Sequence, residues 1–410
     1  MLQIASFLVL AVTVAAAYLR YRDPLYPPVI QASLWLTVLC IFWANESEFY
    51  PLSAGVYFIF VTGAVLFALG AFLATYRFTP PHHSISFRHD RPDWFASLLF
   101  WTPILGFPLM LRRALELAAH GLTGFFLVDL RFALQAKGSY GWLDYLSVLA
   151  LASAVVHFVI VRDRAGRLRF LVAAATAAGY GILTTGRSLL LFLILSILGI
   201  ALITRRVRVS RALLAGGVAV LVMFIGLGIA LGKMGGLQLT LSERAAVVWE
   251  SFRLYLLGSL PAFDRFVRSD VSPTYGANMF RSAIAALARL GLVEPPHGLV
   301  QPFVKVPEPT NVYTVFQPYF GDFSYFGACF VPFFLGLLHG TVFRRATRGT
   351  PFWVVAYGLL LYPLCMQFFQ DQYFNLLSTW AQLALWLVFY FYFSRGRSVR
   401  AQIAPAPTSR

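Results

Sequence analysis

The sequence has few charged residues. Only 12% of its 410 residues are Asp, Glu, Lys or Arg, and 59% are hydrophobic. A soluble domain is about 25% charged and about 45–50% apolar. This composition therefore excludes a soluble globular domain, a disordered chain and a coiled coil. It predicts an all-α, polytopic integral membrane protein.

Lysine and cysteine are also scarce. The only lysines are Lys137, Lys233 and Lys305, so the 33 basic residues are nearly all arginine. The three cysteines all lie in apolar stretches, which excludes a disulfide framework and offers no zinc-binding spacing.

Several catalytic motifs are missing. The chain has no P-loop, dinucleotide fingerprint, nucleophile elbow or HExxH motif, so nothing predicts ATP hydrolysis, NAD chemistry or zinc hydrolysis. It also lacks the paired aspartates with one-residue spacing that often hold the metal of a nucleotide sugar. We therefore expect no cofactor and no metal.

Long apolar segments are abundant, and a helix needs roughly 20 such residues to cross a membrane. We predict eleven spans, at 2–19, 29–43, 53–76, 94–111, 142–161, 169–184, 189–204, 212–232, 318–343, 351–369 and 374–394. The stretch 169–204 is too long for one crossing. Residues 184–188 should therefore form a tight hairpin between two spans.

The arginines predict which side each loop occupies. Arg20 and Arg22 follow the first span, so the positive-inside rule puts the N-terminus outside and the C-terminus inside. The same parity puts five visibly arginine-rich segments inside, within 77–93, 162–168, 205–211, 344–350 and 395–410. The net charge of +16 is then an orientation signal, and nucleic acid is not an expected partner.

This topology predicts four parts. Residues 1–232 hold spans one to eight, 233–317 form a large outer loop, 318–394 hold spans nine to eleven, and 395–410 form a basic inner tail. A structureless loop of such length would be unusual. We expect helices at 241–257 and 279–290, separated by Pro- and Gly-containing turns, so that the loop forms a lid or a cavity wall.

The outer side carries more arginine than a passive surface needs. Arg187 occupies the predicted hairpin beside Gly186, and an ionisable residue at that depth is a functional candidate. Guanidinium groups suit bidentate binding of phosphate. Arg112 and Arg113 lie just past a span, so these two have the alternative of reaching the lipid headgroups.

The outer loop also carries candidate acid–base groups. Glu250 and Arg253 stand three residues apart and can pair on one face of a helix. The alternative to this structural role is that a carboxylate in an arginine-rich cavity acts as a general base. Asp322, at the mouth of the ninth span, needs a partner. His297 lies in the outer loop, where a single histidine is more often structural.

Residues 307–327 enter the ninth span and are rich in small, amide and tyrosine side chains. Such rings stack on sugar faces, and the amides of Asn and Gln hydrogen-bond to sugar hydroxyls. The alternative is an ordinary aromatic belt at the membrane surface.

Three stretches together resemble a known family. They are Thr-Gly-Arg-Ser at 185–188, Leu-Tyr-Leu-Leu-Gly-Ser-Leu-Pro-Ala-Phe-Asp at 254–264, and the stretch 309–327. The chain resembles the bacterial oligosaccharide repeat-unit polymerases, the O-antigen polymerase (Wzy-type) family. The motifs run from about 180 to 345, and the span pattern covers the whole chain. The resemblance implies a fold like that of C-type glycosyltransferases.

The resemblance also implies a reaction. Such enzymes use undecaprenyl-pyrophosphate-linked oligosaccharides on the periplasmic face of the inner membrane, and lengthen an O-antigen, capsule or exopolysaccharide. Arginines would stabilise the departing pyrophosphate. On this interpretation the candidate residues are Arg187, Arg281, Arg265 and Arg253 for pyrophosphate; Glu250, Asp264, Asp322 and His297 for catalysis; and Asn311, Tyr313 and Tyr319 for sugar. Expected partners are the lipid-linked oligosaccharide, membrane lipids and, as a candidate, a chain-length regulator.

Three other functions stay open at this point. An O-antigen ligase-like enzyme uses the same donor with a different acceptor, and such enzymes need a histidine, which keeps His297 of interest. A flippase or transporter of lipid-linked oligosaccharide would typically have twelve or more spans and internal repeats. A non-enzymatic assembly scaffold would leave the arginine of the hairpin unexplained.

Overall fold

The structure is a computed structural model. It describes residues 1–79, 83–88, 94–137, 139–161, 163–232, 240–269, 271–296, 298, 301–393 and 400–405. The described chain is predominantly helical, and it divides into two compact units, each built from segments that are distant in sequence. Unit 1 comprises 1–80, 249–345 and 362–378; unit 2 comprises 81–248, 346–361 and 379–410.

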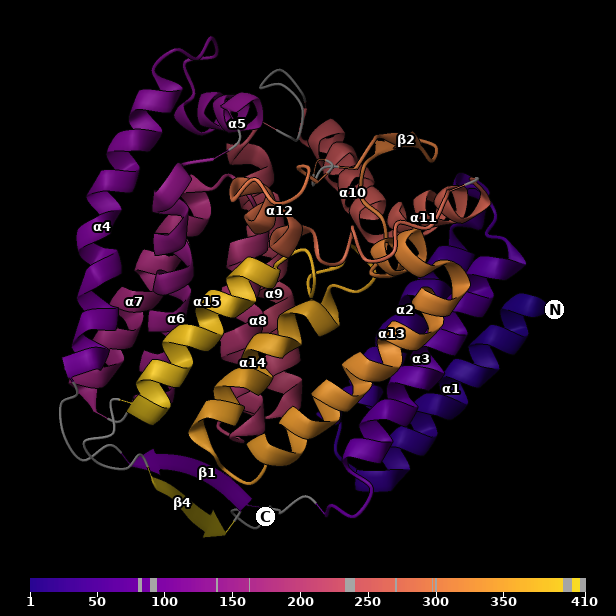
Figure 1. The fold of residues 1–410 in the computed structure, drawn as a ribbon, viewed down its shortest axis with the longest axis horizontal. Helices are drawn as coiled ribbons and strands as arrows, with labels where there is room; N and C mark the ends of the chain where they lie inside the picture. The colour runs from indigo at the N-terminus through magenta and orange to yellow at the C-terminus, as the bar shows by residue number, and fades with distance from the viewer. Residues whose placement is uncertain are drawn as a thin grey trace. The chain divides into compact units, whose positions relative to one another are not determined.

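Unit 1 is built around four long helices. These are α1 (Leu2–Tyr21), α2 (Pro27–Ala44), α3 (Ala54–Ala74) and α13 (Phe316–Ala346). Shorter elements of the segment 233–317, the predicted outer loop, accompany them: most of α10 (Leu241–Leu257), α11 (Ser259–Arg268), α12 (Arg281–Arg289), and the strand pair β2 (Val304–Lys305) and β3 (Pro309–Thr310). Figure 1 shows α1, α2 and α3 side by side in indigo.

Glycine sets the closest helix contact in unit 1. A side chain at Gly70 of α3 would come within 2.0 Å of the Phe333 carbonyl of α13, and one at Gly336 equally close to the Phe67 carbonyl. Only glycine lets the two backbones approach so closely, as in other membrane helix pairs. Aromatic rings fill the adjacent core, where Trp35 stacks on Phe60 with their centroids 4.6 Å apart.

Helix α13 is broken near its N-terminal end. Phe323 and Ser324 leave helical geometry, and Ser324 has a positive φ of 53°. The prediction of a continuous span at 318–343 missed this break, because the segment is apolar and helix-forming on both sides. The short part before the break begins in the outer segment that precedes the predicted span.

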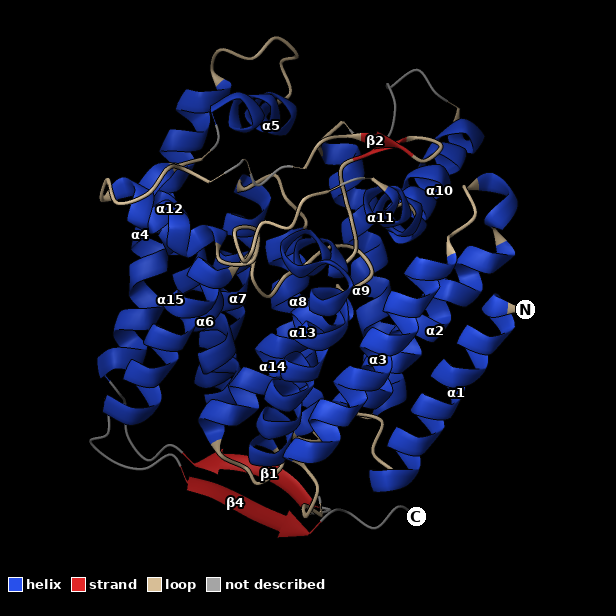
Figure 2. Ribbon diagram, turned by 45° about the vertical axis from the view of Figure 1, so that its right-hand side comes forward, coloured by secondary structure: helices blue, strands red, loops and turns tan. Residues whose placement is uncertain are grey.

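Unit 2 holds most of the other apolar helices. They are α4 (Trp94–Ala118), α6 (Asp144–Ile160), α7 (Arg164–Leu183), α8 (Ser188–Ile203), α9 (Val209–Ala230), most of α14 (Pro351–Cys365), and α15 (Leu377–Val388) with the π-helical turn η3 (Phe389–Phe393). A separate helix, α5 (Phe126–Lys137), lies in the predicted outer loop 112–141, for which the sequence analysis predicted no helix. Strands β1 (His83–Arg88) and β4 (Arg400–Pro405) pair antiparallel, as Figure 2 shows in red.

Each of the eleven predicted spans coincides with a helix, and α7 and α8 confirm the two helices expected around the hairpin. Seven helices in the described chain are long and apolar enough to cross a membrane: α1, α2, α3, α4, the segment 141–160, α9 and α13. Three more are apolar but shorter. The protein is therefore a multi-pass membrane protein, and the count of eleven crossings stays a prediction.

Large apolar side chains on these helices are exposed on the protein surface. Leu19 of α1 is 67% exposed and Leu214 of α9 is 71% exposed. A soluble protein rarely presents such continuous apolar faces to water, whereas lipid covers them without cost.

Hydrogen bonds between segment ends agree with the predicted alternation of sides. Arg20, predicted to be inside, donates at 2.6 Å to the carbonyl of Tyr76, the last residue of the third predicted span, at its inner end. Tyr140, predicted to be outside, donates at 2.6 Å to the carbonyl of Leu183, near the outer end of the sixth predicted span. Strands β1 and β4 likewise join two segments predicted to be inside. The orientation in the membrane stays a prediction.

The two helices expected within 233–317 are confirmed. Helix α10 spans the predicted 241–257, and α12 lies within the predicted 279–290. Thr240 and Glu243 form a capping box at the start of α10, with the Thr240 N–H donating to the Glu243 carboxylate at 2.7 Å. The four-part division at 232, 317 and 394 stays a prediction, since the compact units follow packing rather than loop boundaries.

Candidate functional site

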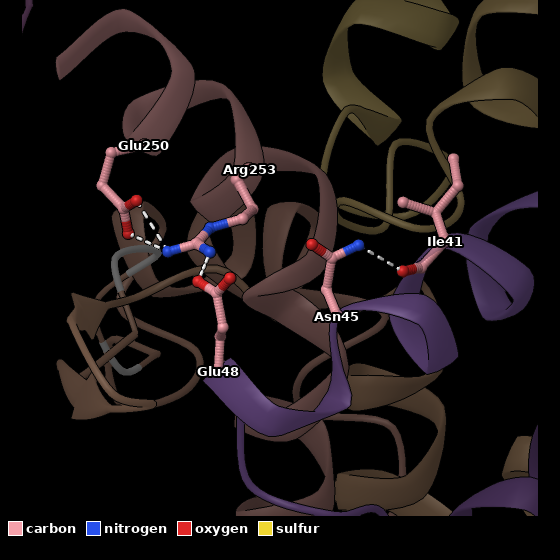
Figure 3. A network of polar contacts seen from close by, with 5 residues as sticks. All are labelled: Ile41, Asn45, Glu48, Glu250 and Arg253. Carbon is pink, nitrogen blue, oxygen red and sulfur yellow. Dashed lines mark hydrogen bonds and ion pairs between the residues drawn. The ribbon is translucent and has the colours of Figure 1, made fainter. Parts of the chain in front are cut away.

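Arg253 of α10 lies between two carboxylates of unit 1. It pairs with Glu250 on its own helix at 2.6 Å, which confirms the expected pairing, and with Glu48 of the turn η1 (Glu46–Glu48). Figure 3 shows both carboxylates turned toward the guanidinium group. The Arg253 side chain is only 14% exposed. A pyrophosphate would have to displace these carboxylates to reach it.

Asp264 of α11 is also held within unit 1. Its carboxylate accepts from the Ser53 backbone N–H at 2.7 Å and pairs with Arg268 at 2.7 Å. The residue is 3% exposed. These contacts fasten α11 to the start of α3, which gives the carboxylate a structural role.

Asp322 is a buried carboxylate that accepts several hydrogen bonds, and it lies immediately before the break in α13. One carboxylate oxygen accepts from the Thr274 hydroxyl at 2.5 Å and from both the backbone N–H and the side-chain amide of Asn278. The other oxygen accepts from the Met279 N–H at 2.8 Å. The sequence correctly predicted that this carboxylate needs a partner. Its donors all come from the turn 274–279, which it fixes against α13.

The two other arginines of unit 1 that were predicted to bind pyrophosphate, Arg265 and Arg281, differ in their surroundings. Arg265 lies over the Tyr50 ring, 4.8 Å from its centroid. Arg281 is the first residue of α12, and partial burial lowers its pKa. The preceding Phe280 packs edge-on against Phe374 at 6.0 Å. This contact places the start of α12 beside the loop 371–375.

The loop 371–375 contains a carboxylate that the sequence analysis did not single out. Asp371 has no exposed surface. It accepts from the Tyr319 hydroxyl at 2.8 Å and from the Tyr373 N–H at 3.1 Å on one oxygen, and from the Phe374 and Asn375 N–H groups on the other. A signal was present, because Gln370-Asp371-Gln372 is a polar triplet between two apolar segments.

Burial raises the pKa of Asp371 from 3.8 to about 6, although its four hydrogen bonds act in the opposite direction. The carboxylate is therefore mostly ionised at neutral pH and can accept a proton within the physiological range. The Tyr319 hydroxyl can reverse from donor to acceptor, so the pair can hold an added proton without losing its contact.

Asp371 lies in the wall of a small polar pocket within unit 1. The pocket wall is made of amide, hydroxyl and carboxylate side chains with one proline, and we call this feature the amide pocket: Gln301, Asn311, Tyr313, Thr314, Gln317, Pro318, Gln370, Asp371 and Asn375. Two of the three predicted sugar-binding residues, Asn311 and Tyr313, are among them. The third, Tyr319, is fully buried and supports the pocket through Asp371.

A second buried polar network adjoins this loop. The Tyr373 hydroxyl lies 2.8 Å from His339 Nε2 and accepts a weaker bond from Gln367. Gln367 in turn accepts from the Trp35 indole N–H at 3.0 Å. These bonds join α2, α13 and the loop after α14, so the loop that carries Asp371 is held on several sides.

Arg187 belongs to unit 2. It precedes the first residue of α8, after Thr185 with its positive φ of 53°. Its guanidinium carbon lies 3.9 Å from the centroid of the Phe224 ring of α9, which is a close cation–π contact. The arginine is partly buried in the hairpin, as its sequence position suggested.

His297 lies outside the described residues. Within the part of the chain that the structure does describe, no group of three His, Cys, Asp or Glu side chains could hold a metal ion. Comparisons with protein-family models, with curated proteins and with solved structures find no match.

Proposed function

We propose that the protein is a membrane glycosyltransferase that polymerises undecaprenyl-pyrophosphate-linked oligosaccharide repeat units. One observation carries the proposal. Arg281 begins α12 where Phe280 packs on Phe374, next to the loop that supplies Asp371 and Asn375 to the amide pocket. A cationic group for pyrophosphate thus stands near neutral polar groups for sugar, and the two parts of a lipid-pyrophosphate glycan need this combination.

The proposed reaction transfers the growing glycan. The bond between its anomeric carbon and the pyrophosphate oxygen breaks, and the lipid pyrophosphate leaves with the electron pair. The hydroxyl oxygen of the incoming repeat unit bonds to that carbon, and its proton passes to a base. We assign this base to Asp371, because it is the carboxylate in the pocket wall and its raised pKa favours accepting a proton.

This assignment adds to the four acid–base candidates from sequence. Glu250 is paired with Arg253, Asp264 with Arg268, and Asp322 accepts four hydrogen bonds from the turn 274–279. Asp371 is equally hydrogen-bonded, but it also lines a pocket beside Tyr313 and Asn311. Its place in the pocket wall is the property that distinguishes it from the other three carboxylates.

In the proposed setting, the chain lies in a bacterial inner membrane with its N-terminus in the periplasm and its C-terminus in the cytoplasm. Arg281 and most residues of the amide pocket belong to segments predicted to be outside, which fits a donor that is presented at the periplasmic face. The lipid chains of the donor would lie against apolar helix surfaces. A chain-length regulator is a further proposed partner.

Arg281→Ala tests the proposal. Loss of a donor aimed at a developing negative charge typically costs about 10²–10³ in rate. We expect long glycan chains to disappear while glycans of a single repeat unit remain, as seen on a gel of surface polysaccharide from a complemented strain. Arg289→Ala is the matched control, because Arg289 is exposed at the other end of the same helix. Chains of normal length in Arg281→Ala would contradict the role of Arg281.

Arg187→Ala tests the predicted clamp of unit 2 in the same strain. We expect the same loss of long chains, with Arg211→Ala in the first turn of α9 as the control, since Arg211 is exposed and predicted to be inside. If even single repeat units disappear from the cell surface, the ligase or flippase function is favoured instead. Normal chain length would contradict the predicted role of Arg187.

A further inference from the structure

Thr314 in the amide pocket has a buried hydroxyl that the fold does not use. The residue has no exposed surface, and no described group forms a hydrogen bond with its Oγ1. Thr314 stands just before α13, where a threonine hydroxyl often accepts the N–H of the residue three positions on. Here the Gln317 N–H bonds to the Thr314 carbonyl instead, at 3.1 Å.

An unused buried hydroxyl is costly. Leaving a buried polar group without a partner costs about 1–3 kcal/mol, so native proteins nearly always provide one. Because Thr314 lines the amide pocket, a group that enters the pocket can supply the missing partner. A hydroxyl donates and accepts, so it complements another hydroxyl as well as it complements water.

The charge of the amide pocket restricts what can enter. Of the residues that line it, Asp371 alone is charged, and the wall contains no Arg, Lys or His. The wall supplies amide N–H donors, carbonyl acceptors and hydroxyls. A phosphate or a sugar carboxylate would meet a buried carboxylate with no compensating cation, which is unfavourable in a site of low dielectric.

The size of the amide pocket further restricts which groups can enter. Its volume is about 10 Å³, which is about the space that one water molecule needs. It therefore takes one hydroxyl group at the edge of a larger molecule rather than a whole sugar ring. The remainder of that molecule would lie outside the pocket.

We infer that the amide pocket is a subsite for one hydroxyl group of an uncharged sugar, which pairs with the orphan hydroxyl of Thr314 and is selected against anionic sugars by Asp371. The identification of the ligand as a sugar rests on the proposed function. The inference adds the class of sugar, which is neutral at this position, and a residue that contributes to binding it.

The test measures binding and not polymer formation. The full-length protein, purified in detergent, is titrated with methyl glucoside and methyl galactoside, and with the two corresponding methyl uronosides, by saturation-transfer NMR. We expect at least one neutral sugar to bind about tenfold more tightly than its uronoside. Thr314→Val, which keeps the volume but removes the hydroxyl, should weaken that binding roughly threefold to tenfold.

Two variants make the result specific. Thr314→Ser keeps the hydroxyl and should bind the neutral sugar within about twofold of the parent protein. Ser196→Ala is the matched control, because Ser196 of α8 also carries a buried hydroxyl with no hydrogen bond to any described group, and it lies in unit 2. Thr314→Val should leave the thermal midpoint unchanged or raise it, because it removes a buried polar group without a partner.

Two results would overturn the inference. If Thr314→Val binds the neutral sugar as tightly as the parent protein does, the pocket holds a structural water only. If a uronoside binds as tightly as its neutral counterpart, the selection by Asp371 is wrong. Preferential neutral-sugar binding that depends on Thr314, in a protein that forms no polymer, would support the subsite and contradict only the proposed polymerase function.

Discussion

The two compact units bury polar groups in different ways. In unit 2, the Ser147 and Thr204 hydroxyls and the His157 ring bond to backbone carbonyls of their own helices, with Thr204 donating to the Ile200 carbonyl at 2.6 Å. Two buried tyrosines, Tyr140 and Tyr180, donate to backbone carbonyls of other helices. In unit 1, buried carboxylates and amides join segments that are distant in sequence, as Asp371 and Tyr319 do. Local bonds keep a helix stable in lipid, whereas long-range polar networks fix a loop in one geometry. The polar groups of unit 1 are therefore those expected of a site.

A bulky substitution at a closely packed glycine should destabilise unit 1 more than any other change considered. Gly336→Leu places a side chain against the Phe67 backbone of α3. A backbone cannot move aside as a side chain can. We therefore expect Gly336→Leu to lower the free energy of unfolding by well above ~3 kcal/mol, which is more than ordinary overpacking costs. Folded protein should be absent from gel filtration in detergent.

The matched control for this change lies in unit 2. Gly217 of α9 faces open space, so Gly217→Leu should be tolerated or slightly stabilising, since leucine favours helix more than glycine does. Equal behaviour of the two variants would show that the contact between α3 and α13 is not as close as described.

The pH dependence of stability should follow Asp371. Its pKa is about 6 in the folded chain and 3.8 when unperturbed. Between these values the folded state holds a proton that the unfolded state has lost. Stability therefore falls as the pH rises from about 4 to about 6 and is constant above, with a total loss of about 3 kcal/mol.

The control for the titration is Asp371→Asn, which cannot ionise. The difference in thermal midpoint between parent and variant, measured from pH 4 to pH 7, removes contributions that the two proteins share. A difference that does not change with pH would mean that Asp371 titrates normally.

Breaking a single ion pair should give the smallest difference in stability between the two units. Glu48→Gln removes one of the two partners of the largely buried Arg253, and we expect a cost of about 1 kcal/mol. Glu116→Gln in α4 of unit 2 breaks pairs with Arg112 and Arg113, which are at least half exposed, and should have a smaller effect on stability because water screens these pairs. Chemical denaturation measures both, and the reverse order would contradict the described environment of Arg253.

The sequence was informative about the helices because membrane crossing imposes length and apolarity on each one. All eleven predicted segments are helical, and α10 has the predicted bounds. The break at Phe323 and Ser324 had no local signal, because it depends on Asp322 binding a turn some 45 residues earlier in the chain. Helix α4 continues to Ala118, so Arg112 and Arg113 are helical residues rather than part of a loop.

The candidate site was less predictable than the fold. Asn311 and Tyr313 were identified by residue type, and both line the amide pocket. Asp371 was missed because a short polar turn between spans is usual, and only tertiary packing shows that its carboxylate is buried against Tyr319. Arg253 was predicted to bind pyrophosphate, but Glu48, which is distant in sequence, already neutralises it.

The break in α13 has a mechanical consequence. Gln317 and Tyr319, which serve the amide pocket, stand on the short arm before the break, and Asp322 anchors that arm to the turn 274–279. The long arm beyond it is fastened to α3 through Gly336. A change in bilayer thickness tilts a spanning helix. We expect the non-helical residues Phe323 and Ser324 to take up such a tilt of the long arm, so that the short arm keeps its geometry.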